Sequence, residues 1–175
     1  VNVYRVKIEA SQAQLNVQEA LDTALSVLKL MGIDIKANPT KEDVDEVFEA
    51  VWNIVREIKP ENLVKLPEMK DKVMLGAMQI LLGSISAAYK IAPMVMNIAV
   101  CKMVELSIKF GDSPFSPGAY SLYGLALCSY ITNIELGDKL EEYIELAYKL
   151  GKINAHIVEK PNMKPSKVVV LDVNN

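Results

Sequence analysis

The stretch LAYKLG, residues Leu146–Gly151, is informative about the fold because two earlier segments of the chain end in a similar way. The segment SIKFG ends at Gly111, and VLKLMG ends at Gly32. Each has a lysine, then one or two bulky apolar residues, then glycine. A lysine in the last turn and a glycine just after it are typical of a helix C-terminus, because glycine readily adopts the left-handed conformation needed there. The three segments therefore predict three helix ends.

The spacing of these endings is close to regular. Gly111 and Gly151 are 40 residues apart, and Gly32 and Gly111 are 79 residues apart, close to two such steps. A helix-ending signal at a nearly constant step indicates helical hairpins that stack on one another. The middle ending is expected near Asp71, where the segment LPEMKD predicts a loop instead. The second unit is therefore predicted to be degenerate.

Signals for helix starts agree with these ends. Asn16–Glu19 and Thr40–Asp43 each pair a short polar residue with an acid three positions later, as a capping box does. Ser116 is followed by a proline, and Pro93 opens another helical segment. Together with the apolar spacing, these signals predict seven helices, over residues 3–14, 17–31, 42–58, 71–91, 93–110, 117–131 and 134–150.

The apolar residues of the second and third predicted helices recur every three to four positions, which indicates one buried face per helix. The 71–110 pair is apolar nearly all round and is therefore expected to form the central hairpin. We predict an all-α fold, a tetratricopeptide-like α-solenoid of antiparallel helical hairpins over residues 1–151. Residues 152–175 are predicted to be an irregular C-terminal tail, with a strand-like run at Val168–Leu171.

The composition narrows the class of protein. Hydrophobic residues make up 51% of the 175 residues and charged residues 23%, so most of the chain is expected to fold. The net charge of −3 and the lack of a basic cluster argue against a nucleic-acid partner. No signal-peptide pattern is visible, and the two cysteines suit a reduced compartment, so a cytoplasmic location is expected. The oligomeric state is not predicted.

The uncharged run over residues 73–89 raises the question of a membrane span. A span needs about 20 predominantly apolar residues, and this shorter run contains Gln79, Ser84 and Ser86. Its small residues are more consistent with helices that pack closely. We therefore predict a buried helix and no membrane span.

Tyr120, Tyr123 and Tyr130 fall on one face of the sixth predicted helix. They have two interpretations. They could form an aromatic surface that binds a segment of a partner protein. Alternatively, their rings pack in the core and their hydroxyl groups reach its edge, which is the more common role of such residues.

The other chemically distinctive residues predict no active site. Cys101 and Cys128 lie at similar distances from the 111–116 turn, so a redox switch is conceivable, although buried cysteine is common. Glu135, Asp138, Glu141, Glu142 and Glu145 make the seventh predicted helix acidic, as a solvated helix face often is. His156 is the only histidine. No nucleotide-binding loop or nucleophile elbow occurs. We therefore predict no catalytic residue, no metal site and no cofactor.

Several longer blocks carry a resemblance to a known family. These are EALDTALSVLKLMGIDI, LPEM, SISAAYKIAPMV, KMVELSIKFGDSPFSPGAYSLYGL and IELGDKLEEYIELAYKL. Over about Tyr4–Leu150 the chain resembles the tetratricopeptide-like helical region of large bacterial multidomain signalling kinases. In that family the helical region follows a serine/threonine kinase domain and an AAA/STAND-type ATPase. A GAF domain and a sensor histidine kinase commonly come after it.

The resemblance implies a function in two-component signal transduction. The segment would be an interaction module that relays the binding of a protein partner to neighbouring catalytic domains of the same chain. The ATP-binding and kinase residues of the family lie outside the matching blocks, so none is assigned here. The ending VEKPNMKPSKVVVLDVNN departs from the helical pattern of the family. The alternative is a small-ligand sensor with an apolar pocket between the central helices.

Overall fold

The structure is a computed structural model that describes residues 16–131 and 140–158. Its helices are α2 (Val17–Leu30), α3 (Lys41–Ile58), the 3₁₀ helix η1 (Pro60–Lys65), α4 (Lys72–Ile91), α5 (Pro93–Phe110), α6 (Ser116–Ile131) and α7 (Leu140–Val158). Within the described ranges, an isolated parallel bridge between Glu68 and Asp112 is the only β-type pairing. The predicted all-α class is therefore confirmed. The predicted helix over 3–14 and the run Val168–Leu171 lie outside the described residues.

Two of the three predicted glycine endings are confirmed. Gly32 has a φ of +83° and Gly111 a φ of +101°, both in the left-handed region. After α2, the Ile33 N–H donates to the Leu28 carbonyl (2.9 Å), and the Gly32 N–H donates to the Lys29 carbonyl (3.1 Å). These two bonds form a Schellman motif, and both apolar residues at its ends are buried. The helix end therefore satisfies carbonyls that would otherwise lack a partner.

The third predicted ending, at Gly151, is wrong. Helix α7 continues through Gly151 to Val158, so residues 152–158 are helical and do not belong to an irregular tail. Ile153 and Ile157 are buried beyond the glycine and continue the apolar face of the helix. Burial of two isoleucines contributes more than the roughly 1 kcal/mol that a glycine costs inside a helix.

The predicted helix starts are largely confirmed. At α3, the Thr40 hydroxyl oxygen accepts from the Asp43 N–H (3.3 Å), and the Asp43 carboxylate accepts from the Thr40 N–H (2.9 Å), which completes a capping box. At α2, the Asn16 side chain accepts from the Glu19 N–H (3.3 Å), so the predicted N-cap is confirmed. The Glu19 carboxylate accepts from the side-chain amide of Asn16 (2.7 Å), which differs from the backbone bond of a capping box. Ser116 differs from the prediction, because it is the first residue of α6 and its hydroxyl group points into the core. The start of the seventh helix was predicted at 134, which lies outside the described residues.

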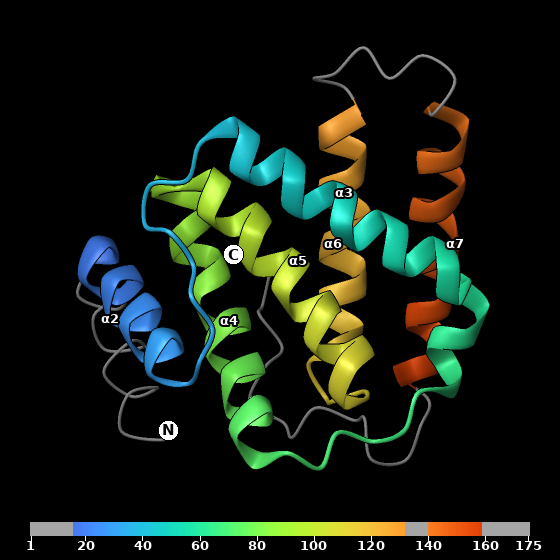
Figure 1. Cartoon of the computed structure of the whole chain (residues 1–175), viewed down its shortest axis with the longest axis horizontal. Coiled ribbons are helices and arrows are strands. Elements are labelled where there is room, and N and C mark those ends of the chain that lie inside the picture. The colour runs from blue at the N-terminus through green and yellow to red at the C-terminus, as the bar shows by residue number, and fades with distance from the viewer. Residues whose placement is uncertain (1–15, 132–139, 159–175) are drawn as a thin grey trace, which may run out of the picture.

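The helices form two antiparallel pairs with two further helices packed against them (Figure 1). α4 packs on α5, and α6 packs on α7, while α5 also packs on α6. Helix α2 packs on α4 and α3 packs on α5. The predicted central hairpin, 71–110, therefore matches α4 and α5, and both of its helices contribute many buried residues.

Helix α3 crosses the other helices instead of joining only its sequence neighbours (Figure 1). The Phe48 ring stacks on Tyr123 of α6 with centroids 5.7 Å apart. One turn later, the Trp52 ring stacks on Tyr143 of α7 with centroids 4.1 Å apart. In a simple solenoid each unit contacts only the next one. These contacts of α3 with α6 and α7 therefore depart from that arrangement.

A buried polar cluster fastens the connection before α4 to the turn between α5 and α6. The Asp112 N–H donates to the Pro67 carbonyl, and the Met69 N–H donates to the Asp112 carbonyl, both at 2.7 Å. The Ser116 hydroxyl group lies 2.7 Å from that of Ser107 and accepts from the Ser113 N–H at 2.8 Å. Because buried polar groups are costly without partners, the Asp112 bonds specify how the two segments meet, and the serine bonds hold the start of α6 against the end of α5.

Candidate functional site

The structure places two of the three predicted partner-binding tyrosines in the core. Tyr120 and Tyr123 are both fully buried. The Tyr120 hydroxyl group donates to the Asp112 carboxylate at 3.0 Å, and burial raises the pKa of this tyrosine. Tyr123 packs on Phe48 of α3. Neither side chain is accessible to a partner protein. This burial agrees with the core-packing interpretation.

The third tyrosine, Tyr130, belongs to α6, but its side chain lies outside the described residues. An aromatic binding surface needs exposed rings, and the rings of Tyr120 and Tyr123 are buried in this structure. The physical reason is the path of α3, which covers the face of α6 that carries Tyr123. A partner-binding site has to be sought elsewhere on the molecule.

The two cysteines lie in different environments. Cys101 is buried in α5, and this burial raises the pKa of its thiol. Cys128 in α6 is exposed, and both thiols are free. Since the thiolate is the reactive form, Cys101 is protected from oxidation in the folded protein.

Two of the acidic residues of α7 are engaged in ion pairs. Glu142 pairs with Arg56 of α3 (3.8 Å), and Glu145 pairs with Lys149 (2.9 Å). Glu135 and Asp138 lie outside the described residues. Across the described ranges, no three His, Cys, Asp or Glu side chains are close enough together to hold a metal ion. His156 belongs to α7, but its side chain also lies outside the described residues.

The surface of the described helices is hollowed where α3, η1 and α7 meet. We call this hollow the Trp52 groove, and its volume is about 440 Å³. Its lining residues come from three segments that are far apart in the sequence: Trp52, Arg56, Lys59, Pro60, Glu61, Glu142, Glu145, Leu146 and Lys149. Apolar residues form its floor and charged residues of both signs form its walls.

The floor of the Trp52 groove rests on an aromatic stack. The rings of Trp52 and Tyr143 are nearly parallel, with an angle of 12° between them. The Tyr143 hydroxyl group donates to the Glu49 carboxylate at 3.3 Å. Burial, followed by the negative charge of Glu49, raises the pKa of Tyr143 to about 12. The phenol is neutral at physiological pH and donates its hydrogen bond to the Glu49 carboxylate, which ties α7 to α3 beneath the floor.

The walls of the groove are joined by two exposed ion pairs. Arg56 of α3 reaches Glu142 of α7 at 3.8 Å, and Lys149 of α7 reaches Glu61 of η1 at 3.3 Å. The side chains of the first pair are 65% and 51% exposed. Hydrogen bonds to Glu145 and Glu61 raise the pKa of Lys149. Exposed pairs of this kind typically contribute only about 0–1 kcal/mol, so these side chains can change partners at little cost while the aromatic stack holds the helices together.

The backbone of Lys59, which lines the groove, has an unusual conformation. Lys59 ends α3 with a φ of +66°, in the left-handed region that favours glycine. An L-residue in that conformation costs roughly 1–2 kcal/mol. The strained turn directs the chain from α3 into η1, and so it sets the angle between two walls of the groove.

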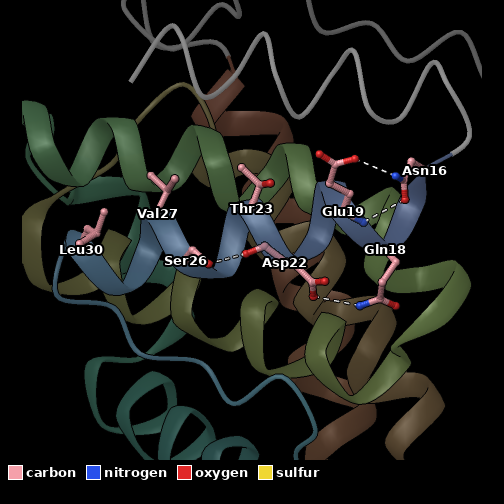
Figure 2. A pocket seen from close by; sticks show the side chains of 8 residues that line it. All are labelled: Asn16, Gln18, Glu19, Asp22, Thr23, Ser26, Val27 and Leu30. Atoms are coloured by element: carbon pink, nitrogen blue, oxygen red, sulfur yellow. Dashed lines mark hydrogen bonds between the residues drawn. The ribbon is translucent and has the colours of Figure 1, made fainter.

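A second hollow, of about 600 Å³, lies along the exposed face of α2 (Figure 2). Its described lining comes only from α2 and its N-cap, and six of the eight residues are of polar types: Asn16, Gln18, Glu19, Asp22, Thr23, Ser26, Val27 and Leu30. Several of these side chains bond one another, as Gln18 does with Asp22 (2.9 Å). A face of one helix with such local bonds is typical of a solvated surface.

Helix α4 is the one described helix that is long and apolar enough to cross a membrane. However, 44% of its most apolar window is buried inside the protein. Its packing on α2 and α5 is sufficient to explain its composition. Neither the Trp52 groove nor the α2 hollow lies between α4 and α5, where the small-ligand alternative expects a pocket.

Sequence reasoning did not identify the Trp52 groove. The spacing around Trp52 correctly predicts a buried face of α3, and the glutamates of α7 stand out as an acidic face. Nothing in the sequence indicates that these two features meet, because almost 90 residues separate Trp52 from Glu142. The one local signal is Lys59-Pro60, since a proline just past a helix often marks its end.

Comparisons with known proteins identify no relative. No family model matches the chain, and neither a curated protein nor a solved structure matches it.

Proposed function

We propose that this chain is a helical protein-interaction module of a multidomain cytoplasmic signalling kinase. In this proposal a partner binds in the Trp52 groove, and the module passes that event to neighbouring catalytic domains of the same protein. The observation that carries the proposal is the groove itself, with its apolar floor between a wall that includes Arg56 and a wall that includes Glu142. Such a mixture of apolar and charged groups is suited to polypeptides, whose side chains offer both.

We propose further that α4–α5 and α6–α7 are two units of a tetratricopeptide-like stack. The antiparallel packing within each pair, and the packing of α5 on α6 between them, support this arrangement. Helix α3 would then act as a brace that locks the two pairs together. Through Phe48 and Trp52 it contacts both helices of the second pair.

The relay would use the position of the groove at the junction of three segments. A partner held between α3 and α7 stabilises one separation of these helices, and any other arrangement of the module becomes less populated. A neighbouring domain that contacts α3 or α7 would respond to that change. No catalytic chemistry is assigned to the segment itself.

The proposal is tested with the nucleotide-binding domain that the resemblance predicts in the parent protein. The purified chain is added to that domain, and both binding and the rate of ATP hydrolysis are measured. We expect saturable binding and a changed hydrolysis rate. If the chain neither binds the domain nor changes its rate, the proposal is wrong.

A further inference from the structure

We propose that the Trp52 groove binds a polypeptide segment in which one apolar side chain is flanked by an acidic and a basic residue. This inference rests on the proposed function and specifies the chemistry of the partner. It follows from the distribution of charge and apolar surface around the groove.

The two long walls of the groove differ in the sign of their net charge. Arg56 and Lys59 lie one turn apart at the C-terminal end of α3 and make that wall basic. The α7 wall carries Glu142, Glu145 and Lys149, and so it is acidic by one net charge, with Lys149 paired to Glu145 at 2.9 Å. A segment with only acidic residues would be repelled by α7, and one with only basic residues would be repelled by α3. A segment with one residue of each sign is complementary to both walls.

The floor accepts an apolar side chain. Trp52 and Leu146 are each only 4% exposed, and Pro60 is buried beside them. The long side chains of Arg56 and Lys149 line the groove above this floor, where their aliphatic parts shield apolar surface while their charged ends stay in water. An incoming apolar side chain replaces this partial cover with a closer contact.

Binding requires an exchange of ion pairs. The Arg56–Glu142 contact is long, at 3.8 Å, and both side chains are more than half exposed. A partner that supplies an acid to Arg56 and a base to Glu142 forms two pairs in place of one. The intramolecular pair therefore spans the groove in the free protein and is exchanged at little cost when such a partner arrives.

The chain offers a specific reporter for this event, since Trp52 is its only tryptophan. Its indole N–H signal in NMR spectra and its fluorescence both report on the floor of the groove. The probes are four synthetic peptides that differ only in their central residues: Glu-Leu-Lys, Glu-Leu-Glu, Lys-Leu-Lys and Glu-Ala-Lys.

We expect the Glu-Leu-Lys peptide to shift the Trp52 signal saturably. The two peptides with a single charge sign should bind about two- to fivefold more weakly, as expected for the loss of an exposed ion pair. The alanine peptide should bind roughly tenfold more weakly, because it buries less apolar surface. Equal shifts with all four peptides, or no shift with any of them, would overturn the inference.

A charge-reversal variant tests the walls directly. Arg56→Glu combined with Lys59→Glu makes both walls acidic, and preference should move to the Lys-Leu-Lys peptide. Arg56→Glu combined with Glu142→Arg restores an ion pair across the groove, and it serves as the matched control that retains the preference for the mixed peptide. An unchanged preference in the first variant, with helix content retained by circular dichroism, contradicts the inference.

The two proposals fail in different ways. If the nucleotide-binding domain binds but the Trp52 signal does not move, the chain is an interaction module that uses another surface. The assignment of partner binding to the Trp52 groove is then wrong, and the present inference with it, while the role as an interaction module stands. If neither the domain nor any peptide binds, both proposals are wrong.

Discussion

Trp52 of α3 and Tyr143 of α7 stack with their ring centroids 4.1 Å apart and their planes 12° from parallel. The two residues are 91 positions apart in the sequence and belong to helices that neither follow one another nor form a hairpin. This contact fixes α3 against the second helix pair. It also forms the base of the groove to which we assign partner binding.

Tyr143→Phe should change how stability depends on pH. The folded-state pKa of Tyr143 is raised to about 12, above its ordinary value of 10.0, mainly by burial. The unfolded chain therefore loses this proton first, so the contribution of Tyr143 is complete below pH 10 and is lost as pH rises toward 12. We expect the wild-type protein to lose more stability than the variant between pH 9 and pH 11.

Urea unfolding at several alkaline pH values measures this difference. At pH 7 the variant lacks one hydrogen bond to the Glu49 carboxylate and should lose about 1.5–3 kcal/mol, the range for a bond to a charged group. If the free energy of unfolding fell equally with pH in the two proteins above pH 10, Tyr143 would not be the titrating group.

Replacement by alanine should change stability differently at the three glycines that end similar sequences. A Cβ atom at Gly151 meets nothing within 4 Å, and the residue is helical, so Gly151→Ala should stabilise the protein by about 0.5–1 kcal/mol. Gly32 has a positive φ but open surroundings, so Gly32→Ala should cost about 1 kcal/mol.

Gly111→Ala should be the most damaging of the three. Its φ is +101°, and a Cβ atom would lie 2.4 Å from the Pro67 carbonyl oxygen, which belongs to the backbone and cannot easily move. We expect a loss of about 2 kcal/mol or more in the free energy of unfolding. Thermal or urea unfolding of the three variants gives the order directly, and any other order would contradict our account of these helix ends.

Tyr123→Ala should lower the free energy of unfolding substantially, as expected for truncation of a core residue. Tyr123 is fully buried and stacks on Phe48, so its truncation should cost about 3–5 kcal/mol. Leu125→Ala is the matched control on the same helix, because Leu125 is 65% exposed, and it should change stability by less than about 0.5 kcal/mol. Similar losses in both variants would mean that α6 does not present these faces as described.

Thr40→Ala should remove the N-cap of α3. The Thr40 hydroxyl group satisfies the Asp43 N–H, and without it the helix start should lose about 1 kcal/mol. Thr40→Ser keeps the hydroxyl group and serves as the control, with stability close to that of the wild-type protein. If the unfolding curve of Thr40→Ala matched that of the wild-type protein, the capping box would contribute nothing measurable.

The sequence by itself determined the helices where the signal was local. Caps, glycines and apolar spacing are properties of a few neighbouring residues, so Thr40 and Gly32 could be assigned correctly without knowledge of the rest of the chain. The same local logic was wrong at Gly151, because what continues α7 is the burial of Ile153 and Ile157 against other helices.

Only the tertiary structure decided which faces are covered. Tyr123 is a plausible surface residue in the sequence and a core residue in the fold, because α3 crosses over α6. The Trp52 groove arises in the same way, from Lys59 turning the chain into η1 and from the approach of α7. The physical reason is that a helix depends mainly on contacts within four residues, whereas a groove depends on long-range packing that no local pattern encodes.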